Sequence, residues 1–283
     1  MAQSLGKKIA RIFSVLVASL LLCCAAFLFT ACETDHPKIK MTIKFNGDTY
    51  ELNYKLYRNM YPKTVAHYLE LIDLGFFDDT VIHDYSSSYG FYGGAYYVKE
   101  GEDDLTLLDY DALELKNISV WADEDKTEAL NTLVGEFTSN GYKVENNGLT
   151  HVKGSLSTHY YLDSTANKNV YTTLASGAGK QYKYNCTTSQ FLISASSNSA
   201  LNESYCTFGI LADSKDEDKF SDLLNAISAF VSKKQDLDED FSFTYEWQDS
   251  VAGNNYVSDY QVTYNVPNYE NMIVIKKVEV TKY

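Results

Sequence analysis

A few side chains in this sequence have types that could carry out chemistry, and each has a simpler structural explanation. His83 lies in a run of strand-forming residues and could transfer protons, but a packed or hydrogen-bonded histidine is the favoured interpretation. The acidic run 236–240 has alternating carboxylates, yet it lacks the glycine and the terminal glutamate of a calcium loop. The sequence has no Cys-x-x-Cys pair and no serine-hydrolase, metalloprotease or phosphate-loop motif. We therefore expect no cofactor and no metal.

A different kind of chemistry is indicated by six segments in a fixed order. They are Tyr61-Pro62-Lys63-Thr64, residues 75–83 (GFFDDTVIH), 135–141 (GEFTSNG), 151–157 (HVKGSLS), 189–193 (SQFLI), and Thr207-Phe208-Gly209. In that order they resemble the cyclophilin family of peptidyl-prolyl cis-trans isomerases, over nearly all of residues 40–283. The resemblance implies a mainly β fold, a closed eight-stranded antiparallel barrel capped by two helices.

Rotating an X-Pro bond means crossing a barrier of about 18–20 kcal/mol, for which neither a nucleophile nor a metal is needed. Cyclophilins hold the proline ring in an apolar pocket and place an arginine to stabilise the twisted amide. That arginine directly follows a histidine that corresponds to His83, and this chain has Asp84 there. Losing one preorganised donor typically lowers a rate by about 10²–10³-fold. The resemblance therefore implies an isomerase whose activity is weak or lost.

The other site positions follow from the same resemblance. Gln190 matches the family's glutamine, Leu192 replaces the phenylalanine that floors the proline pocket, and Tyr92 replaces a second glutamine. Gly90 stands where the family has a methionine. The implied catalytic positions are Gln190 and Asp84, and the implied substrate-binding positions are His83, Tyr89, Tyr92, Phe191, Leu192, Ala200, Leu201 and Tyr205.

Few cations are available to replace the missing arginine. Arg58 is the only arginine after the N-terminal apolar segment. It lies just before the first expected helix, in a strand end that the family keeps away from its groove. Lys99 or Lys180, from inserted segments, could reach the site. We favour the interpretation that neither does.

Two helices must position these residues. The first is predicted from Pro62 to about Leu74, with Gly75 ending it, because proline suits the first helical position. The second is predicted to open on a capping box of Ser214 and Glu217. Its apolar stripe is Phe220, Leu223, Leu224, Ile227 and Val231.

Most of the remaining chain is predicted to form strands. Residues 41–45 and 49–54 alternate around an Asn-Gly turn and indicate a hairpin, and residues 272–280 are predicted to form a closing strand. Three stretches interrupt the resemblance as insertions, at about 95–132, 160–186 and 236–270. Long loops on such a scaffold tend to be surface decoration or to line a binding site.

The N-terminus is typical of an export signal. A basic region with Lys7, Lys8 and Arg11 precedes an apolar run at 12–29, which is also about long enough for a retained membrane anchor. Small residues then precede Cys32, as in a bacterial lipobox. We predict a lipoprotein-type signal peptide at 1–31, lipidation of Cys32, a tether at 32–39 and a cyclophilin-like domain at 40–283. The predicted localisation is extracytoplasmic, lipid-anchored to the bacterial cell membrane.

The charge balance narrows the possible partners. Without residues 1–31 the chain keeps 21 basic and 38 acidic residues, a net charge of −17. Nucleic-acid affinity comes mainly from basic residues, so nucleic acid is excluded as a partner. We predict a monomer that meets proline-containing exported polypeptides or a surface protein. Spacing alone leaves open whether Cys186 and Cys206 pair.

Three functions remain open at this stage. The first is a folding helper of the cyclophilin type with weak or lost isomerase activity. The second is a cyclophilin-like module that binds a peptide or protein without catalysis, which the abundance of tyrosine favours because tyrosine combines contact area with a polar group. The third, supported only by tyrosine content, is a lipoprotein whose aromatic loops bind a glycan.

Overall fold

The computed structural model describes residues 34–108, 110, 113–121, 124–127, 129–144, 149–159, 170–173, 179–182, 186–202, 205–237, 241–243, 246–247, 260–261 and 267–283. Residues 35–282 form one compact unit. The predicted signal segment and Cys32 lie outside the described residues. Among the helices in the described ranges, none has both the length and the apolar content needed to cross a membrane.

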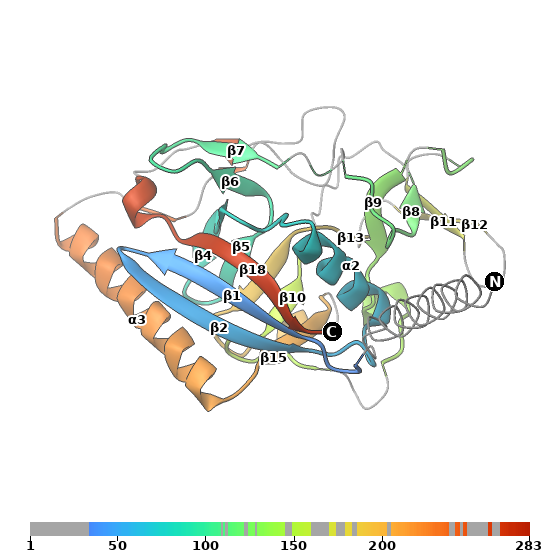
Figure 1. Ribbon diagram of the computed structural model, residues 1–283, viewed down its shortest axis with the longest axis horizontal. Helices are drawn as coiled ribbons and strands as arrows, with labels where there is room; N and C mark the ends of the chain where they lie inside the picture. The colour runs from blue at the N-terminus through green and yellow to red at the C-terminus, as the bar shows by residue number, and fades with distance from the viewer. Residues whose placement is uncertain are drawn as a thin grey trace, which may run out of the picture. The chain divides into compact units, whose positions relative to one another are not determined.

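An antiparallel sheet curled around a hydrophobic core is the centre of the fold (Figure 1). Its strands, in hydrogen-bonded order, are β4 (Asp84–Ser86), β5 (Gly90–Gly93), β14 (Phe191–Ser194), β10 (Leu156–Thr158), β15 (Thr207–Leu211), β2 (Asp48–Leu56), β1 (Lys38–Phe45), β18 (Val274–Lys282), β3 (Thr80–Val81), β6 (Tyr96–Val98) and β7 (Leu105–Leu107). The predicted fold class, mainly β with a curled antiparallel sheet and two helices, is confirmed.

The two ends of this strand order meet in one chain segment. β3 and β4 are successive parts of residues 80–86, where the Ile82 amide donates to the Ile273 carbonyl at 2.9 Å and the His83 amide to the Tyr92 carbonyl at 3.0 Å. Residues 80–86 therefore pair with β18 on one edge and with residues 90–98, which contain β5 and β6, on the other. Counted as continuous strands, these segments close the sheet into the predicted eight-stranded barrel, and β7 adds an outer strand.

The hairpin and the closing strand lie where the sequence predicts them. β1 and β2 pair from Lys38↔Lys55 to Phe45↔Asp48, and the two turn residues, Asn46 and Gly47, have φ of 49° and 87°. Two successive residues with positive φ form a turn whose twist matches the right-handed twist of the strands in a hairpin. β18 then pairs with β1 along its length, so the C-terminal strand lies next to the N-terminal one.

Helix α2 (Pro62–Asp73) confirms the first predicted helix. Its buried side carries Val65, Leu69 and Ile72, and Gly75 follows with φ of 68°, a left-handed conformation that suits a residue just after a helix end. Tyr61 caps the helix without a side-chain hydrogen bond. The carboxylate of Glu136, far along the sequence, accepts the amides of the first turn instead.

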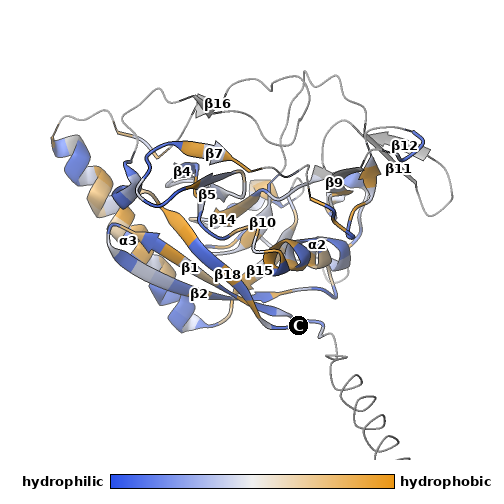
Figure 2. Ribbon diagram, turned by 45° about the horizontal axis from the view of Figure 1, so that its top comes forward, coloured by the Kyte–Doolittle hydropathy of each residue, from blue (hydrophilic) through white to orange (hydrophobic). Residues whose placement is uncertain are grey.

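Helix α3 (Ser214–Asp236) carries the predicted stripe, visible as a hydrophobic band along one side of the helix in Figure 2. Phe220, Leu223 and Ile227 are fully buried. The predicted capping box is wrong, because the helix begins one residue earlier. The Asp213 carboxylate accepts the amides of Lys215 at 2.9 Å and Asp216 at 3.2 Å, so Ser214 is the first helical residue rather than the cap.

Two of the insertions build structure of their own. Strands β8 (Val120–Trp121) and β9 (Ala129–Val134) come from the first, and β11 (Val170–Thr173), β12 (Gly179–Tyr182) and β13 (Cys186–Thr187) from the second and its end. They form a second sheet in the order β12-β11-β8-β9-β13. Pairing of Tyr171 with Trp121 joins the two insertions. Sequence reasoning treated them as separate loops, because the partners are too far apart in the chain for local patterns to show their pairing.

The third insertion is described only in part. Strands β16 (Glu246–Trp247) and β17 (Tyr260–Gln261) form a short hairpin. Phe243 precedes it and packs edge-on against Phe45, with ring centroids 5.9 Å apart. Short 3-10 helices complete the described elements: η1 (Thr138–Asn140), η3 (Ser199–Leu201) and η4 (Tyr269–Asn271).

Candidate functional site: a filled sheet face beside an open pocket

The sheet places three of the predicted site residues in one row. Asp84 is opposite Tyr92 across β4 and β5, and Tyr92 is opposite Leu192 across β5 and β14. Directly opposed residues on neighbouring strands present their side chains to the same face. Residues one step along, Phe91 and Ile193, are instead fully buried in the barrel core. The row Asp84–Tyr92–Leu192 therefore lies on the outer face of the barrel wall.

Aromatic rings gather around Tyr92, the middle residue of this row. The His159 ring meets the Tyr92 ring edge-on, with centroids 4.8 Å apart, and stacks on the Tyr205 ring at 5.8 Å and 10°. Burial lowers the pKa of His159 to about 4, so the ring is neutral at physiological pH. Burial raises the pKa of Tyr92, and the neighbouring Tyr205 and Asp84 raise it further. The cluster His159, Tyr92 and Tyr205, which we call the aromatic cover, therefore adds no positive charge to the row.

Three further predicted residues are buried. His83 is fully buried with its ring edge-on to Tyr96 at 5.4 Å, and burial followed by the proximity of His159 lowers its pKa to about 3. Gln190 is also fully buried. Its backbone carbonyl accepts hydrogen bonds from the Tyr68 hydroxyl and the His159 backbone amide. Phe191 points into the core, edge-on to Phe77 at 5.7 Å. None of the three is on the exposed surface.

The remaining predicted residues are more exposed. Tyr89 is 49 % exposed in the turn between β4 and β5, Ala200 is exposed on η3, and Leu201 is half-buried. Gly90, at the methionine position, has φ of 144°, and a Cβ there would lie 2.0 Å from the Ile193 carbonyl oxygen. The close approach of β5 to β14 thus requires glycine, and no side chain can enter the face from that position.

The candidate replacement cations have other surroundings. The Arg58 amide donates to the Asp35 carbonyl, in the segment between β2 and α2. The Lys99 ammonium lies 3.7 Å from Glu102, and both side chains are more than half exposed. The backbone of Lys180 lies in β12, and its side chain is outside the described part of the structure.

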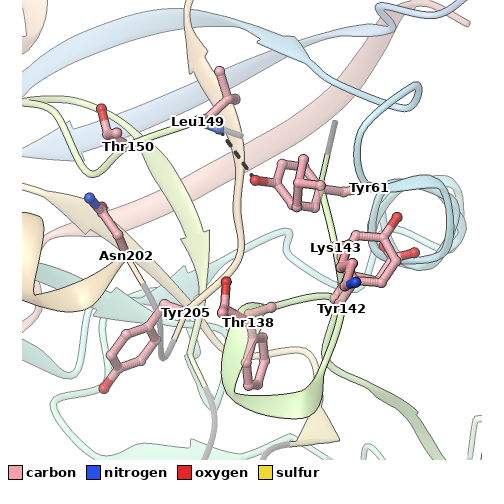
Figure 3. Close-up of a pocket in the computed structure, with 11 residues that line it drawn as sticks. Tyr61, Thr138, Tyr142, Lys143, Leu149, Thr150, Asn202 and Tyr205 are labelled. Carbon is pink, nitrogen blue, oxygen red and sulfur yellow. Dashed lines mark hydrogen bonds between the residues drawn. The ribbon is translucent and has the colours of Figure 1, made fainter. Parts of the chain in front are cut away.

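Next to the aromatic cover is a pocket of about 440 Å³ (Figure 3). It lies beside the N-terminal end of α2 and is lined by Tyr61, Glu136, Phe137, Thr138, Tyr142, Lys143, Val144, Leu149, Thr150, Asn202 and Tyr205. Tyr205 belongs to both the cover and the pocket wall. The Leu149 amide donates to the Tyr61 hydroxyl at 3.3 Å, and the Tyr142 hydroxyl donates to the Met60 carbonyl at 2.8 Å. These bonds fix two tyrosines of the wall.

The sequence matches a known protein family over most of its length. A family model described as "Cyclophilin type peptidyl-prolyl cis-trans isomerase/CLD" matches residues 39–239. The chain belongs to this family. The match ends before β18, so the strand that completes this cyclophilin-type barrel lies beyond the matched residues. No curated protein sequence matches the chain.

Solved structures of low similarity include two of a cyclophilin-type peptidyl-prolyl cis-trans isomerase from Cryptosporidium parvum. One is 16% identical, covers 88% of this chain and 99% of that chain, and has a TM-score of 0.41. The other was determined in the presence of the dipeptide Ala-Pro. It is 15% identical, covers 87% of this chain and 99% of that chain, and has a TM-score of 0.42.

Sequence reasoning missed two important residues of this cyclophilin-type chain. His159 directly follows β10, and its position beside Tyr92 depends on the pairing of β10 with β14, which no local pattern in the sequence shows. Glu136 was noticed as part of a motif, but its position under α2 depends on a contact across more than seventy residues. Cys206 is a free, buried thiol whose sulfur lies 3.8 Å from the Thr64 hydroxyl.

Proposed function

We propose that this chain is a polypeptide-binding protein of the cyclophilin type, held at the outer surface of a bacterial membrane, whose isomerase turnover is weak or absent. The observation that carries the proposal is the row itself: Asp84 lies opposite Tyr92 on the outer face, at the position that the motif resemblance assigns to the family's arginine. A carboxylate cannot donate to the amide nitrogen of a twisting X-Pro bond, and its charge repels the neighbouring carbonyl oxygen.

Further features support a protein that still binds polypeptide but has lost turnover. His159 and Tyr205 stack on each other beside Tyr92, where a proline ring would need an open apolar floor. His83 remains neutral because of burial, so it supplies no replacement cation. Exposed Tyr89 and half-buried Leu201 at the rim, together with the pocket beside Tyr205, leave surface suited to holding an extended segment.

The location belongs to the same proposal. The basic and apolar N-terminal segment followed by small residues and Cys32 supports export and lipidation of that cysteine. Polypeptides emerging unfolded on the outer side of the membrane would be the available ligands. Mass spectrometry of the chain from a bacterial membrane fraction tests this step: a diacylated N-terminal Cys32 is expected, and an intact N-terminus with residues 1–31 retained would contradict it.

The activity is tested by prolyl cis-trans exchange of a proline tetrapeptide with the full chain in detergent, beside Asp84→Arg. We expect the unaltered chain to leave the exchange at its uncatalysed rate and the variant to raise it. Turnover by the unaltered chain at or above the rate of the variant would show that another group supplies the donor, and the proposal would fail.

The second candidate function is a true folding isomerase. It is favoured by one observation, that the family glutamine is retained as Gln190 with its backbone fixed by Tyr68 and His159. It differs from the first in predicting measurable turnover that falls when Gln190 is changed to alanine.

A further inference from the structure

The pocket beside α2 contains one buried charge. Glu136 is 3 % exposed and lines the pocket. Its two carboxylate oxygens accept the backbone amides of Lys63 at 3.2 Å and Thr64 at 2.9 Å. Burial raises the pKa of this carboxyl, whereas the bonds to Thr64 and Lys63 act in the opposite direction. The amides anchor the carboxylate but supply no full positive charge.

In the described surroundings of Glu136, the Lys63 side chain contributes a favourable charge interaction from beyond ion-pair distance. No lysine, arginine or histidine side chain in the described ranges forms an ion pair with it within 4.0 Å. Lys143, at the rim of the pocket, is exposed. A buried carboxylate that lacks a close ion pair is costly, so a cation entering the pocket would be attracted to it.

The walls of the pocket suit the same kind of group. Tyr61 and Tyr142 lie with ring centroids 6.5 Å apart at 31°, and Phe137 and Tyr205 also line the space. Aromatic faces attract ammonium and guanidinium groups, and they also cover the aliphatic part of a lysine or arginine side chain. A pocket of about 440 Å³ accommodates one long side chain with room for water.

From this geometry we propose that the pocket binds a basic side chain, lysine or arginine, of the polypeptide that the protein holds, with Glu136 as the anionic partner and the tyrosine rings as walls. This rests on the proposed function and adds a specificity to it. Tyr205 connects the two regions, because its ring stacks on His159 in the aromatic cover and also lines the pocket. The strongly acidic balance of the chain favours basic ligands as well.

The first test uses two capped tripeptides, Ac-Ala-Arg-Ala-NH₂ and the same peptide with citrulline, which has nearly the shape of arginine but no charge. Each is titrated into the full chain in detergent by calorimetry. We expect the arginine peptide to bind at least about tenfold more tightly. Equal affinity of the two peptides, or no binding of the arginine peptide at millimolar concentration, would overturn the proposal.

Variants locate the effect in this pocket. Lys143→Glu removes a repelling charge from the rim and should tighten arginine binding several-fold. Lys215→Glu makes the same charge change at the exposed start of α3 and should leave affinity unchanged. Thr150→Trp should fill the exposed rim and abolish binding. An equal gain from both glutamate variants would mean that only net charge attracts the peptide, and would contradict the pocket assignment.

A third peptide separates this proposal from the proposed function. Ac-Ala-Ala-Pro-Phe-NH₂ has no basic group, so its binding reports the cyclophilin-type face alone. Binding of this peptide together with equal affinity for arginine and citrulline would overturn only the basic-side-chain pocket. Absence of binding for all three peptides would overturn both proposals.

Discussion

The aromatic cover and the pocket beside α2 share Tyr205 and differ in almost everything else. In the cover, His159 stacks on Tyr205 and meets Tyr92 edge-on, and Asp84 lies opposite Tyr92 on the neighbouring strand. In the pocket, the tyrosine rings surround open space and a carboxylate anchored by helix amides. The barrel of the family is present, packed aromatic rings line one part of its outer face, and an open pocket lies beside that part.

The largest effect is expected from a double variant that places an arginine at position 84 and removes the His159 ring. Asp84→Arg restores a donor, and His159→Ala opens the row, so the double variant should exchange a proline peptide about 10²–10³-fold faster than the unaltered chain. Each single variant should fall well short of the product, because donor and space are needed together. Measured exchange rates that are the same for the double variant and the unaltered chain would show that the filled face is not what limits turnover.

Glu136→Ala tests the other region. It removes the acceptor of two amides at the start of α2 and should lower the free energy of unfolding by about 2–4 kcal/mol, since hydrogen bonds to a buried charge are strong. Denaturant unfolding measures this loss. A loss under about 0.5 kcal/mol would mean that Glu136 does not hold α2, and that the pocket floor is free to move.

The stack over the row predicts a pH dependence. His159 has a pKa of about 4 in the folded chain, below its ordinary value of 6.5, so the unfolded chain binds more protons between these values. Its contribution to stability is therefore complete above pH 6.5 and is lost as the pH falls toward 4.

His159 is half-buried as a residue, so solvent screening reduces the size of this contribution. We expect it to be on the order of 2 kcal/mol, below what the full pKa difference would give. His159→Phe keeps the stack and removes the titration, so unfolding measured at pH 7 and pH 4.5 should show a smaller acid loss for the variant. An unchanged loss would assign the acid sensitivity to other buried histidines, such as His67 and His83.

The smallest effect is expected at α3, which provides a matched reference for α2. Asp213 caps α3 from the adjacent residue, on the exposed surface, and Asp213→Ala should cost about 1 kcal/mol. The same denaturant measurement applies. A cost equal to that of Glu136→Ala would remove the distinction between an ordinary exposed cap and the buried carboxylate of the pocket.

Local signals explain how much of this structure could be predicted. Pro62, Gly75 and the spacing of Val65, Leu69 and Ile72 were enough for α2, and the Asn46-Gly47 turn was enough for the first hairpin. Those features act within a few residues of one another, so a single sequence contains them. The six motifs, each a short run of neighbouring residues, were likewise enough to predict the barrel through the family resemblance.

The rest depends on contacts that no local pattern encodes. The cap of α2 comes from Glu136, and the second sheet forms because Tyr171 meets Trp121 from a separate insertion. The motif resemblance proposes Asp84 and Tyr92 as site residues, but it could not show the aromatic cover, because His159 reaches Tyr92 only when β10 lies beside β14. Even the start of α3 was misplaced by one residue, since Asp213 and Ser214 are both good caps.

The central claim is most directly tested by NMR exchange spectroscopy of Ac-Ala-Ala-Pro-Phe-NH₂ with the unaltered full chain. The account predicts that peptide resonances shift on binding while no exchange between cis and trans forms appears above the uncatalysed rate, which is tens to hundreds of seconds. Rapid exchange that disappears in Gln190→Ala would contradict it, and would identify the chain as a working isomerase that uses a donor other than arginine.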